Sequence, residues 1–132
     1  MSRLLFKELS YEIQGSFFDV YKSLRNAFKE KIYHQALKEE LKERNIGFES
    51  EKRLTVYYKS IKVGVYVPDL IIEKLVLIEI KAKPFLIDED KKQFWFYLKG
   101  SEYRVGYLVN FGSPKKVEFL RRVYDEARNK SV

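Results

Sequence analysis

The stretch PDLIIEKLVLIEIKAK, residues 68–83, reads as a buried strand pair but carries two acids and a lysine among its apolar residues. The Glu73–Lys74 pair interrupts the apolar run and predicts the turn of a hairpin. A turn centred on this pair places Asp69 opposite Glu79, and a shift of one residue would leave them diagonal neighbours. Side chains alternate along a strand, so Glu79 and Lys81 share one face. The sequence therefore predicts that these three groups converge on one patch of an apolar sheet.

Such a patch favours metal-assisted chemistry on phosphate. Two carboxylates this close in low dielectric repel each other, so one takes up a proton or a cation lies between them. Lys81 neutralises one charge, and the second acid leaves room for Mg²⁺, which commonly uses one or two carboxylates plus water and phosphate. A neighbouring lysine can orient or deprotonate water, so the set predicts phosphodiester hydrolysis. The alternative is a solvated Glu79–Lys81 pair on an exposed sheet face, since the D…E-x-K pattern is short.

The residues before this stretch predict two helices and the start of a sheet. Residues 4–44 read as helix with a break near Asn26, and the segment 45–47 closes the second helix. The apolar face of the first helix is expected at Leu5, Leu9, Ile13, Phe17, Val20 and Leu24. That of the second helix is expected at Phe28, Ile32, Ala36 or Leu37, and Leu41. From Phe48 onward the chain reads as three strands, with turns at Lys59–Ser60 and Glu73–Lys74.

A third helix over residues 88–99 is expected to end at Gly100, and EYRVGYLVNFG reads as the next strand. Residues 114–128 fit either a strand through Val123 or a short helix. The order α-α-β-β-β-α-β, followed by one more element, predicts an α/β fold in which helices flank a mixed central sheet.

Composition narrows the class of protein. The 132 residues fit one domain, 1–132, and the 45% hydrophobic content is enough for a core. The absence of cysteine excludes a disulfide scaffold, thiol catalysis and Cys-ligated metal, and it fits the cytoplasm. No apolar run approaches the length of a membrane span, and the N-terminus does not read as a signal peptide. The net charge of +7 suits a polyanion such as nucleic acid, although many small proteins are basic without a specific reason.

The central pattern also resembles a known group of enzymes. The Pro68–Asp69 pair followed by Glu79-Ile80-Lys81 on the next strand is similar to the core motif of the PD-(D/E)xK nuclease superfamily, which includes restriction endonucleases and junction resolvases. This resemblance implies a restriction-endonuclease-like three-layer fold.

A longer run resembles one branch of that superfamily, the GxxExxY proteins, over roughly residues 10–112. AFKEKIYHQALKEELKERNIGFESEKRLTVYYK is similar to their second helix and first strand, with Glu30 and Tyr33 at the named positions. Ala27 replaces the leading Gly, so the connection between the two helices is expected to differ. The later matches are Gln93, Tyr97 and Leu98 on the third helix, and Asn110 and Phe111 on the closing strand.

The resemblance implies roles for individual residues. Asp69 and Glu79 would ligate Mg²⁺, with Mn²⁺ as a substitute and the Ile80 carbonyl as a third ligand. Lys81 would position the attacking water. Glu30 would be an additional acid ligand, and Gln93 a polar group that faces the same site.

Each of these peripheral residues also has a simpler interpretation. Glu30 could be a solvated helix charge, and Gln93 an ordinary exposed side chain. Tyr33 and Tyr97 fit core aromatics with hydrogen-bonded hydroxyls. His34, the only histidine, reads as a surface residue of its helix.

Candidate phosphate-binding residues flank the motif, although basic runs are usually solvated faces. They are Lys83, Lys91, Lys92 and Lys99, with a second group at Lys115, Lys116, Arg121 and Arg122. The segment QFWFYL, which contains Phe94, Trp95 and Phe96, is apolar around most of its turn. Core packing is expected for at least two of these three, and a homodimer interface or a platform for unpaired bases would explain the rest.

The expected function is therefore a metal-dependent nuclease, with DNA preferred to RNA. The alternatives are a non-cleaving nucleic-acid-binding domain and a protein-interaction domain of the same fold. The intact acid and lysine set favours the nuclease, because binding-only relatives often lose one of these residues.

Overall fold

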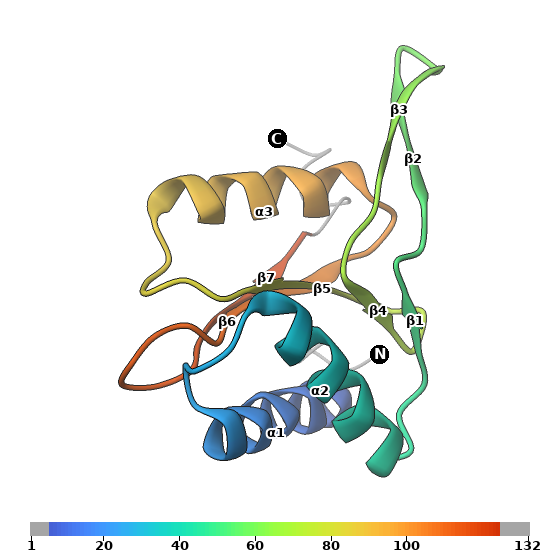
Figure 1. Cartoon of the computed structure of the whole chain (residues 1–132). Coiled ribbons are helices and arrows are strands. Elements are labelled where there is room, and N and C mark those ends of the chain that lie inside the picture. Colours follow the sequence, from blue (N-terminus) through green and yellow to red (C-terminus); the bar gives the residue numbers. More distant parts are fainter. Residues whose placement is uncertain (1–5, 125–132) are drawn as a thin grey trace.

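The computed structural model describes residues 6–124, which form three layers (Figure 1). Helices α1 and α2 cover one face of the main sheet and α3 covers the other. The elements in chain order are α1 (Lys7–Leu24), α2 (Glu30–Glu43), β1 (Phe48–Ser50), β2 (Leu54–Tyr58), β3 (Ile61–Tyr66), β4 (Leu70–Ile72), β5 (Val76–Lys81), α3 (Asp88–Gly100), β6 (Val105–Asn110) and β7 (Glu118–Val123). The expected mixed α/β architecture is confirmed, whereas the expectation of one domain over 1–132 stays a prediction.

The main sheet has five strands in the order β1-β4-β5-β6-β7. β5 and β6 pair in parallel, and α3 makes the crossover between them, as a parallel connection requires. The other neighbours in this sheet are antiparallel. β5 therefore lies in the centre, buried on both faces, which explains its near-continuous run of Val, Leu and Ile.

The second helix buries Leu37 and Leu41 as predicted, but not Phe28 and Ile32. Tyr33, Leu37 and Leu41 are fully buried, whereas Phe28 and Ile32 are 47% and 45% exposed. The Tyr33 ring stacks on Phe111, with centroids 4.8 Å apart, and its hydroxyl donates to the Arg25 carbonyl and accepts from Phe28 N–H. Tyr33 is thus a core aromatic with a bonded hydroxyl, as expected. This contact anchors the start of α2, so Tyr33, one position after the predicted Ile32, is the residue buried there.

A single guanidinium joins the first two helices. Arg44 lies 2.7–2.8 Å from carboxylate oxygens of Glu12, Asp19 and Glu40. A Cβ atom at Gly15 would lie 3.0 Å from the Arg44 Nη1 atom, so the glycine in the middle of α1 makes room for this group. The α1–α2 pair is therefore held by charge as well as by its apolar face.

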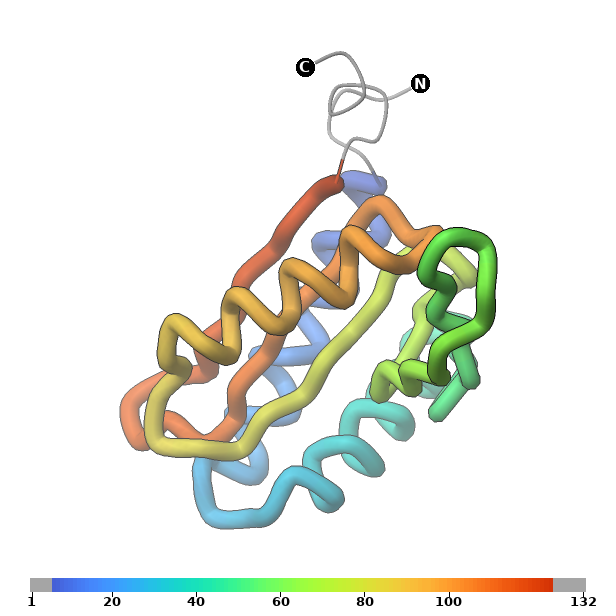
Figure 2. The backbone as a smooth tube through the Cα atoms, turned by 90° about the horizontal axis from the view of Figure 1, so that it is seen from above, coloured from blue at the N-terminus to red at the C-terminus, as the bar shows by residue number. Residues whose placement is uncertain are grey.

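Three strands were expected between residues 48 and 81, but the structure has five, β1 to β5. The predicted turns are confirmed, since Lys59, Ser60, Glu73 and Lys74 all have positive φ. However, the strand expected to run from 61 to 72 breaks at Pro68, which has no N–H for a ladder. β2 and β3 then form a separate two-stranded sheet, the hairpin, which stands beside the C-terminal end of α3 (Figures 1 and 2).

The ambiguous C-terminal segment is a strand. β7 ends at Val123, and it pairs along the whole of β6. Residues 125–128 of the expected segment lie outside the described residues.

Candidate active site

The hairpin of β4 and β5 brings the two central acids together. Leu70 pairs with Ile78 and Ile72 with Val76, and continuing this register places Asp69 opposite Glu79. The positive φ angles of Glu73 and Lys74, 53° and 59°, match the tight hairpin turn that sets this register. The predicted facing of Asp69 and Glu79 is therefore present. Both acids lie on the α3 face of the sheet, since they alternate with residues packed on α1 and α2.

The side chain of Asp69 supplies the last hydrogen bond between β4 and β5, just beyond their paired residues. Its Oδ2 atom accepts a 2.7 Å hydrogen bond from the Ile80 backbone N–H. Pro68 is opposite Ile80 in the continued register, and it has no N–H to offer to the Ile80 carbonyl. The N–H and C=O of one residue in a ladder point to the same neighbour, so the Ile80 carbonyl faces the Asp69 side. The next carbonyl along, that of Lys81, points the other way and accepts from Phe111 N–H.

Glu79 is a carboxyl held in an unfavourable place for a charge. Burial is the main reason that its pKa is raised to about 8. The charge of Glu30 also acts to raise this pKa, whereas Lys81 and a hydrogen bond from the Asp69 backbone act to lower it. At neutral pH and without a cation, Glu79 is therefore largely protonated. Ionising Glu79 in this buried position is unfavourable, and a bound cation would make it favourable.

Glu30, at the first position of α2, belongs to the same cluster. Loss of water around its carboxyl and the charge of Asp69 raise the pKa of Glu30, while Lys81 and His34 act in the opposite direction. The pKa of Asp69 is also raised, chiefly by burial, against the effects of the Ile80 hydrogen bond, His34 and Lys81. Glu30, Asp69 and Glu79 thus form one electrostatic unit, which the sequence alone left open for Glu30.

Lys81 supplies the positive charge of this unit. Its charge lowers the pKa of all three acids and also that of Asp90 on α3. Within residues 6–124, no carboxylate lies within ion-pair distance of its Nζ atom. Lys81 therefore remains available to a water molecule or a phosphate oxygen.

Lys83, predicted to bind nucleic acid, is committed to another contact. Its Nζ atom lies 2.7 Å from Asp90 Oδ2, which also accepts from the Ile87 N–H at the start of α3. Burial acts to raise the pKa of Asp90, but these hydrogen bonds outweigh it and lower the pKa. The pair fastens the beginning of α3 to the end of β5, so Lys83 has a structural partner.

A buried amide holds the loop that follows Lys81. Asn110 is fully buried; its Oδ1 atom accepts from the N–H groups of Lys83 and Gly112, and its Nδ2 atom donates to the Lys83 carbonyl and to Glu118. A Cβ atom at Gly112 would lie 2.2 Å from the Lys83 nitrogen. The segments that follow β5 and β6 are therefore in direct backbone contact at Lys83 and Gly112, two residues beyond Lys81.

The remaining predicted residues lie at varying distances from this unit. Gln93 is exposed on α3, one turn beyond Asp90 and on the same helical side, and it makes no hydrogen bond within the described residues. Lys91 shares a hollow beside β7 with Lys116, away from β4. Lys99 lies over the rings of Trp95 and Phe96.

The other basic candidates and the aromatic run are also placed. Lys92, Lys115 and Arg122 are exposed, and Arg121 contacts Ser10. Of the aromatic run on α3, Phe94 is buried, Trp95 is half-buried and Phe96 is exposed. Core packing thus holds for Phe94 and in part for Trp95.

Two residues that the sequence did not place at the site, His34 and Glu51, act on the acids. His34, expected to be a plain surface residue, is half-buried, lies 3.2 Å from Ser50 Oγ and acts on the pKa of Asp69 and Glu30. Its position four residues after Glu30 was the available signal, because such residues are neighbours on a helix. Glu51 also acts on Asp69, and its N–H donates to the Asp69 carbonyl. Nothing in the local sequence around Glu51 indicates this contact.

The donor set fits Mg²⁺ or Mn²⁺ through few protein ligands. Among residues 6–124, no three His, Cys, Asp or Glu side chains are arranged to hold a metal by themselves. Mg²⁺ usually keeps several waters and uses one or two carboxylates, which Asp69 and Glu79 provide, and the Ile80 carbonyl faces the same side. Burial raises the pKa of both acids, so an added positive charge beside them would favour their ionised forms.

A three-layer α/β fold with two acids and a lysine at the end of a central hairpin defines a nuclease-like class of protein. A family model of the PD-(D/E)XK nuclease superfamily matches residues 7–123, and the chain belongs to this superfamily. Members of this superfamily typically use divalent metals. No curated protein matches the chain significantly.

Among solved structures, the chain is similar to one described as the crystal structure of SSO0001. The identity is 28% and the TM-score is 0.51, over 74% of this chain and 52% of that one. The chain thus spans about half the length of that protein. No helix within residues 6–124 is long and apolar enough to cross a membrane.

Proposed function

We propose that this chain is a metal-dependent nuclease that hydrolyses phosphodiester bonds, with DNA as the preferred substrate. The observation that carries the proposal is the facing of Asp69 and Glu79, with Lys81 on the same sheet face and without an ion-pair partner among residues 6–124. Superfamily membership supports the same activity.

In this proposal Asp69, Glu79 and the Ile80 carbonyl hold Mg²⁺ or Mn²⁺, with Glu30 as an additional acid ligand, directly or through water. The metal supplies Lewis-acid activation of phosphate and water when bound. Lys81 orients the attacking water and stabilises charge that develops on the phosphate oxygens. Gln93, Lys91, Lys92 and Lys99 are proposed as further contacts to the substrate, and Lys83 as a residue that contributes through its position near the site.

Two features of α2 support a phosphate path beside the acids. Lys31, His34 and Lys38 line one hollow together with Ser50 and Glu51. Lys31 and Lys38 have no ion-pair partner among the described residues. These two lysines place positive charge at the hollow, where it can meet a sugar–phosphate backbone.

The finer assignments are also proposals. The match of Glu30, Tyr33 and the third helix favours the GxxExxY branch. The departures are Ala27 in place of Gly and LRNAF in place of the Gly-rich turn before it. Tyr33 bridges Arg25 and Phe28 across the very connection that these departures were expected to alter. A homodimer and a cytoplasmic location stay predictions.

The test combines metal binding with cleavage. Wild type, Asp69→Asn, Glu79→Gln and Lys81→Gln are titrated with Mn²⁺ and Mg²⁺ by calorimetry and incubated with labelled single-stranded, duplex and branched DNA and with RNA. We expect the wild type to bind metal and cleave. The two acid variants should lose both properties, and Lys81→Gln should bind metal but lose cleavage. Metal binding without cleavage of any substrate would favour the non-cleaving alternative, and absence of metal binding by the wild type would exclude the proposed site.

A further inference from the structure

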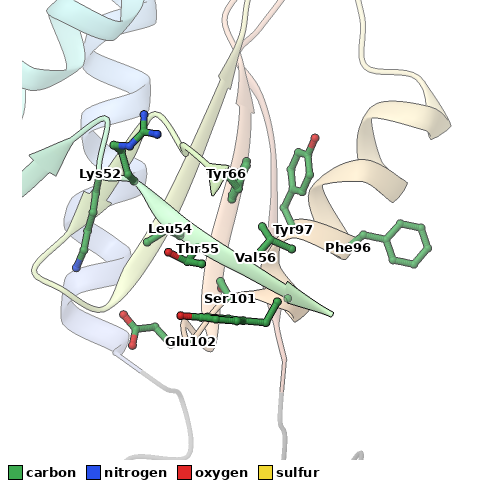
Figure 3. Close-up of a pocket in the computed structure, with 12 residues that line it drawn as sticks. Lys52, Leu54, Thr55, Val56, Tyr66, Phe96, Tyr97, Ser101 and Glu102 are labelled. Atoms are coloured by element: carbon green, nitrogen blue, oxygen red, sulfur yellow. The ribbon is translucent and has the colours of Figure 1, made fainter. Parts of the chain in front are cut away.

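A second concave site lies outside the acid cluster, between the β2–β3 hairpin and the C-terminal half of α3 (Figure 3). This hairpin cleft has a volume of about 500 Å³, which is within the range of small-molecule sites. Its walls are mainly apolar and aromatic, formed by Leu54, Val56, Tyr57 and Tyr66 of the hairpin and by Phe96 and Tyr97 of α3.

The cleft presents flat rings to solvent. Tyr57 and Phe96 are 65% and 63% exposed, and Tyr66 stacks on Tyr97 with centroids 4.1 Å apart. The Tyr66 hydroxyl is buried and has no hydrogen-bond partner in the described part of the chain. That hydroxyl is out of reach of an occupant, so the exposed rings are what the cleft offers. They suit a planar heterocycle better than an aliphatic chain.

The positive charge of the hairpin favours an anionic occupant of the cleft. Residues 52–67 contain Lys52, Arg53, Lys59 and Lys62 and no acid. Arg53 lines the cleft and makes no ion pair within residues 6–124, and Glu102 is the acid on the opposite rim. A second copy of this chain would bring its own basic hairpin against this one. A polyanion meets no such repulsion.

The cleft also lies on the same side of the sheet as the acid cluster. Tyr66 precedes Asp69 by three residues, and Ile71 and Leu77 of the motif hairpin pack in the same apolar cluster as Tyr66 and Leu54. A nucleic-acid strand bound at the acids therefore has the cleft within reach of its neighbouring nucleotides.

We propose that the hairpin cleft binds an unpaired nucleobase of the substrate strand, so that the enzyme prefers single-stranded nucleic acid or duplex with a single-stranded flank. This inference rests on the proposed nuclease function for its biological setting. Bases in an intact duplex are stacked on both faces and are not free to enter a cleft of this kind, whereas unpaired bases stack on aromatic side chains irrespective of sequence.

The test measures binding in EDTA, so that it does not depend on metal or cleavage. Fluorescence anisotropy with labelled oligo(dT) and with a blunt duplex of equal length compares wild type, Tyr57→Ala and Tyr58→Ala. Tyr57 and Tyr58 are adjacent on β2 and equally exposed, at 65% and 63%, but only Tyr57 lines the cleft. We expect Tyr57→Ala to weaken oligo(dT) binding about tenfold, as loss of one base–aromatic stack does, and to leave duplex binding unchanged. Tyr58→Ala should match the wild type.

A second measurement locates the base directly. Photo-crosslinking with an oligo(dT) that carries 5-iodouracil, followed by mass spectrometry, should place the crosslink on Tyr57, Tyr97 or Phe96. Equal losses in both tyrosine variants, or crosslinks elsewhere, would overturn the proposal. So would sedimentation data in which Tyr57→Ala converts a dimer to a monomer, because the cleft would then be a subunit interface. A cleft that binds oligo(dT) in a protein that cleaves nothing would refute the nuclease proposal alone.

Discussion

The carboxylate of Asp69 accepts a 2.7 Å hydrogen bond from the backbone N–H of Ile80, across the point where Pro68 ends the β4–β5 ladder. The side chain that we propose as a metal ligand thus also completes the hydrogen bonding of a central strand. The backbone N–H fixes the position of the acid before any metal binds. Stability and metal binding at this residue should therefore be separable.

Replacing Asp69 by Asn or Ala should achieve that separation. Asn retains an oxygen that can accept from Ile80 N–H and removes a buried charge, so its free energy of unfolding in EDTA should equal or exceed that of the wild type. Ala leaves the N–H unsatisfied and should be less stable than Asn by about 1–3 kcal/mol. Urea denaturation measures both values, and Mn²⁺ should stabilise neither variant. Equal stability of the two variants would show that the hydrogen bond contributes nothing.

The raised pKa of Glu79, about 8 against 4.5 in the unfolded chain, should make the metal-free protein less stable as pH rises. Between these values the folded state binds more protons than the unfolded state, so the free energy of unfolding falls with increasing pH, by at most about 5 kcal/mol. Denaturation in EDTA from pH 4.5 to 9 measures this slope. Glu79→Gln should reduce it, and the raised pKa values of Asp69 and Glu30 should leave a remainder. An unchanged slope in Glu79→Gln would contradict the assignment.

Gly112→Ala should disrupt the backbone contact between Gly112 and Lys83, two residues after Lys81, the proposed catalytic lysine. The new Cβ atom would meet the Lys83 nitrogen at 2.2 Å, and this neighbour is backbone and moves only with its strand end. We expect a loss of about 2–3 kcal/mol of stability, in the range of overpacked cores, together with reduced cleavage. Gly100→Ala is the matched control, since nothing lies within 4 Å of its Cβ position, and its stability should be unchanged or higher. A stable Gly112→Ala would show that the two strand ends separate easily.

Arg44→Met should weaken the α1–α2 pair. It removes three hydrogen-bonded carboxylate contacts at 2.7–2.8 Å, partly exposed to solvent, and we expect a loss of about 1–2 kcal/mol that shrinks in 1 M NaCl. Lys42→Met removes one exposed pair with Glu39 and should cost less than about 0.5 kcal/mol. Thermal or urea denaturation at two salt concentrations measures both. Equal effects of the two substitutions would argue against a cooperative Arg44 network.

The two lysines Lys83 and Lys92 should differ in how they affect DNA binding. Lys83 is paired with Asp90, whereas Lys92 is exposed and unpaired in the part of the chain that the structure describes. Lys92→Gln should lower the slope of log affinity against log salt by about 0.7–0.9, the loss of one phosphate contact. Lys83→Gln should lower stability and leave the slope unchanged. The reverse result would show that substrate displaces Asp90 from Lys83.

Local pattern predicted the centre of the fold well. The Glu73–Lys74 turn and the alternation along β5 were enough to place Asp69 opposite Glu79, because a hairpin register depends on its turn and on nothing distant. The resemblance added Glu30, whose charge does act on the cluster. Pattern predicted Leu41, and Leu37 as an alternative, on the buried face of α2, but not Tyr33. A 3.6-residue periodicity allows two neighbouring stripes, and the Tyr33–Phe111 contact selects between them.

Contacts between segments far apart in sequence were decided only by the tertiary structure. The partner of Lys83, the amide network of Asn110 and the approach of His34 all depend on which strands are neighbours in the sheet, which no local period encodes. The hairpin cleft arises the same way, since β2–β3 separates from the main sheet at Pro68 and stands against α3. The sequence by itself determined the acids, the lysine and their register, because these lie within one hairpin. The tertiary structure decided what surrounds them, because burial and charge at a site depend on every segment that packs there.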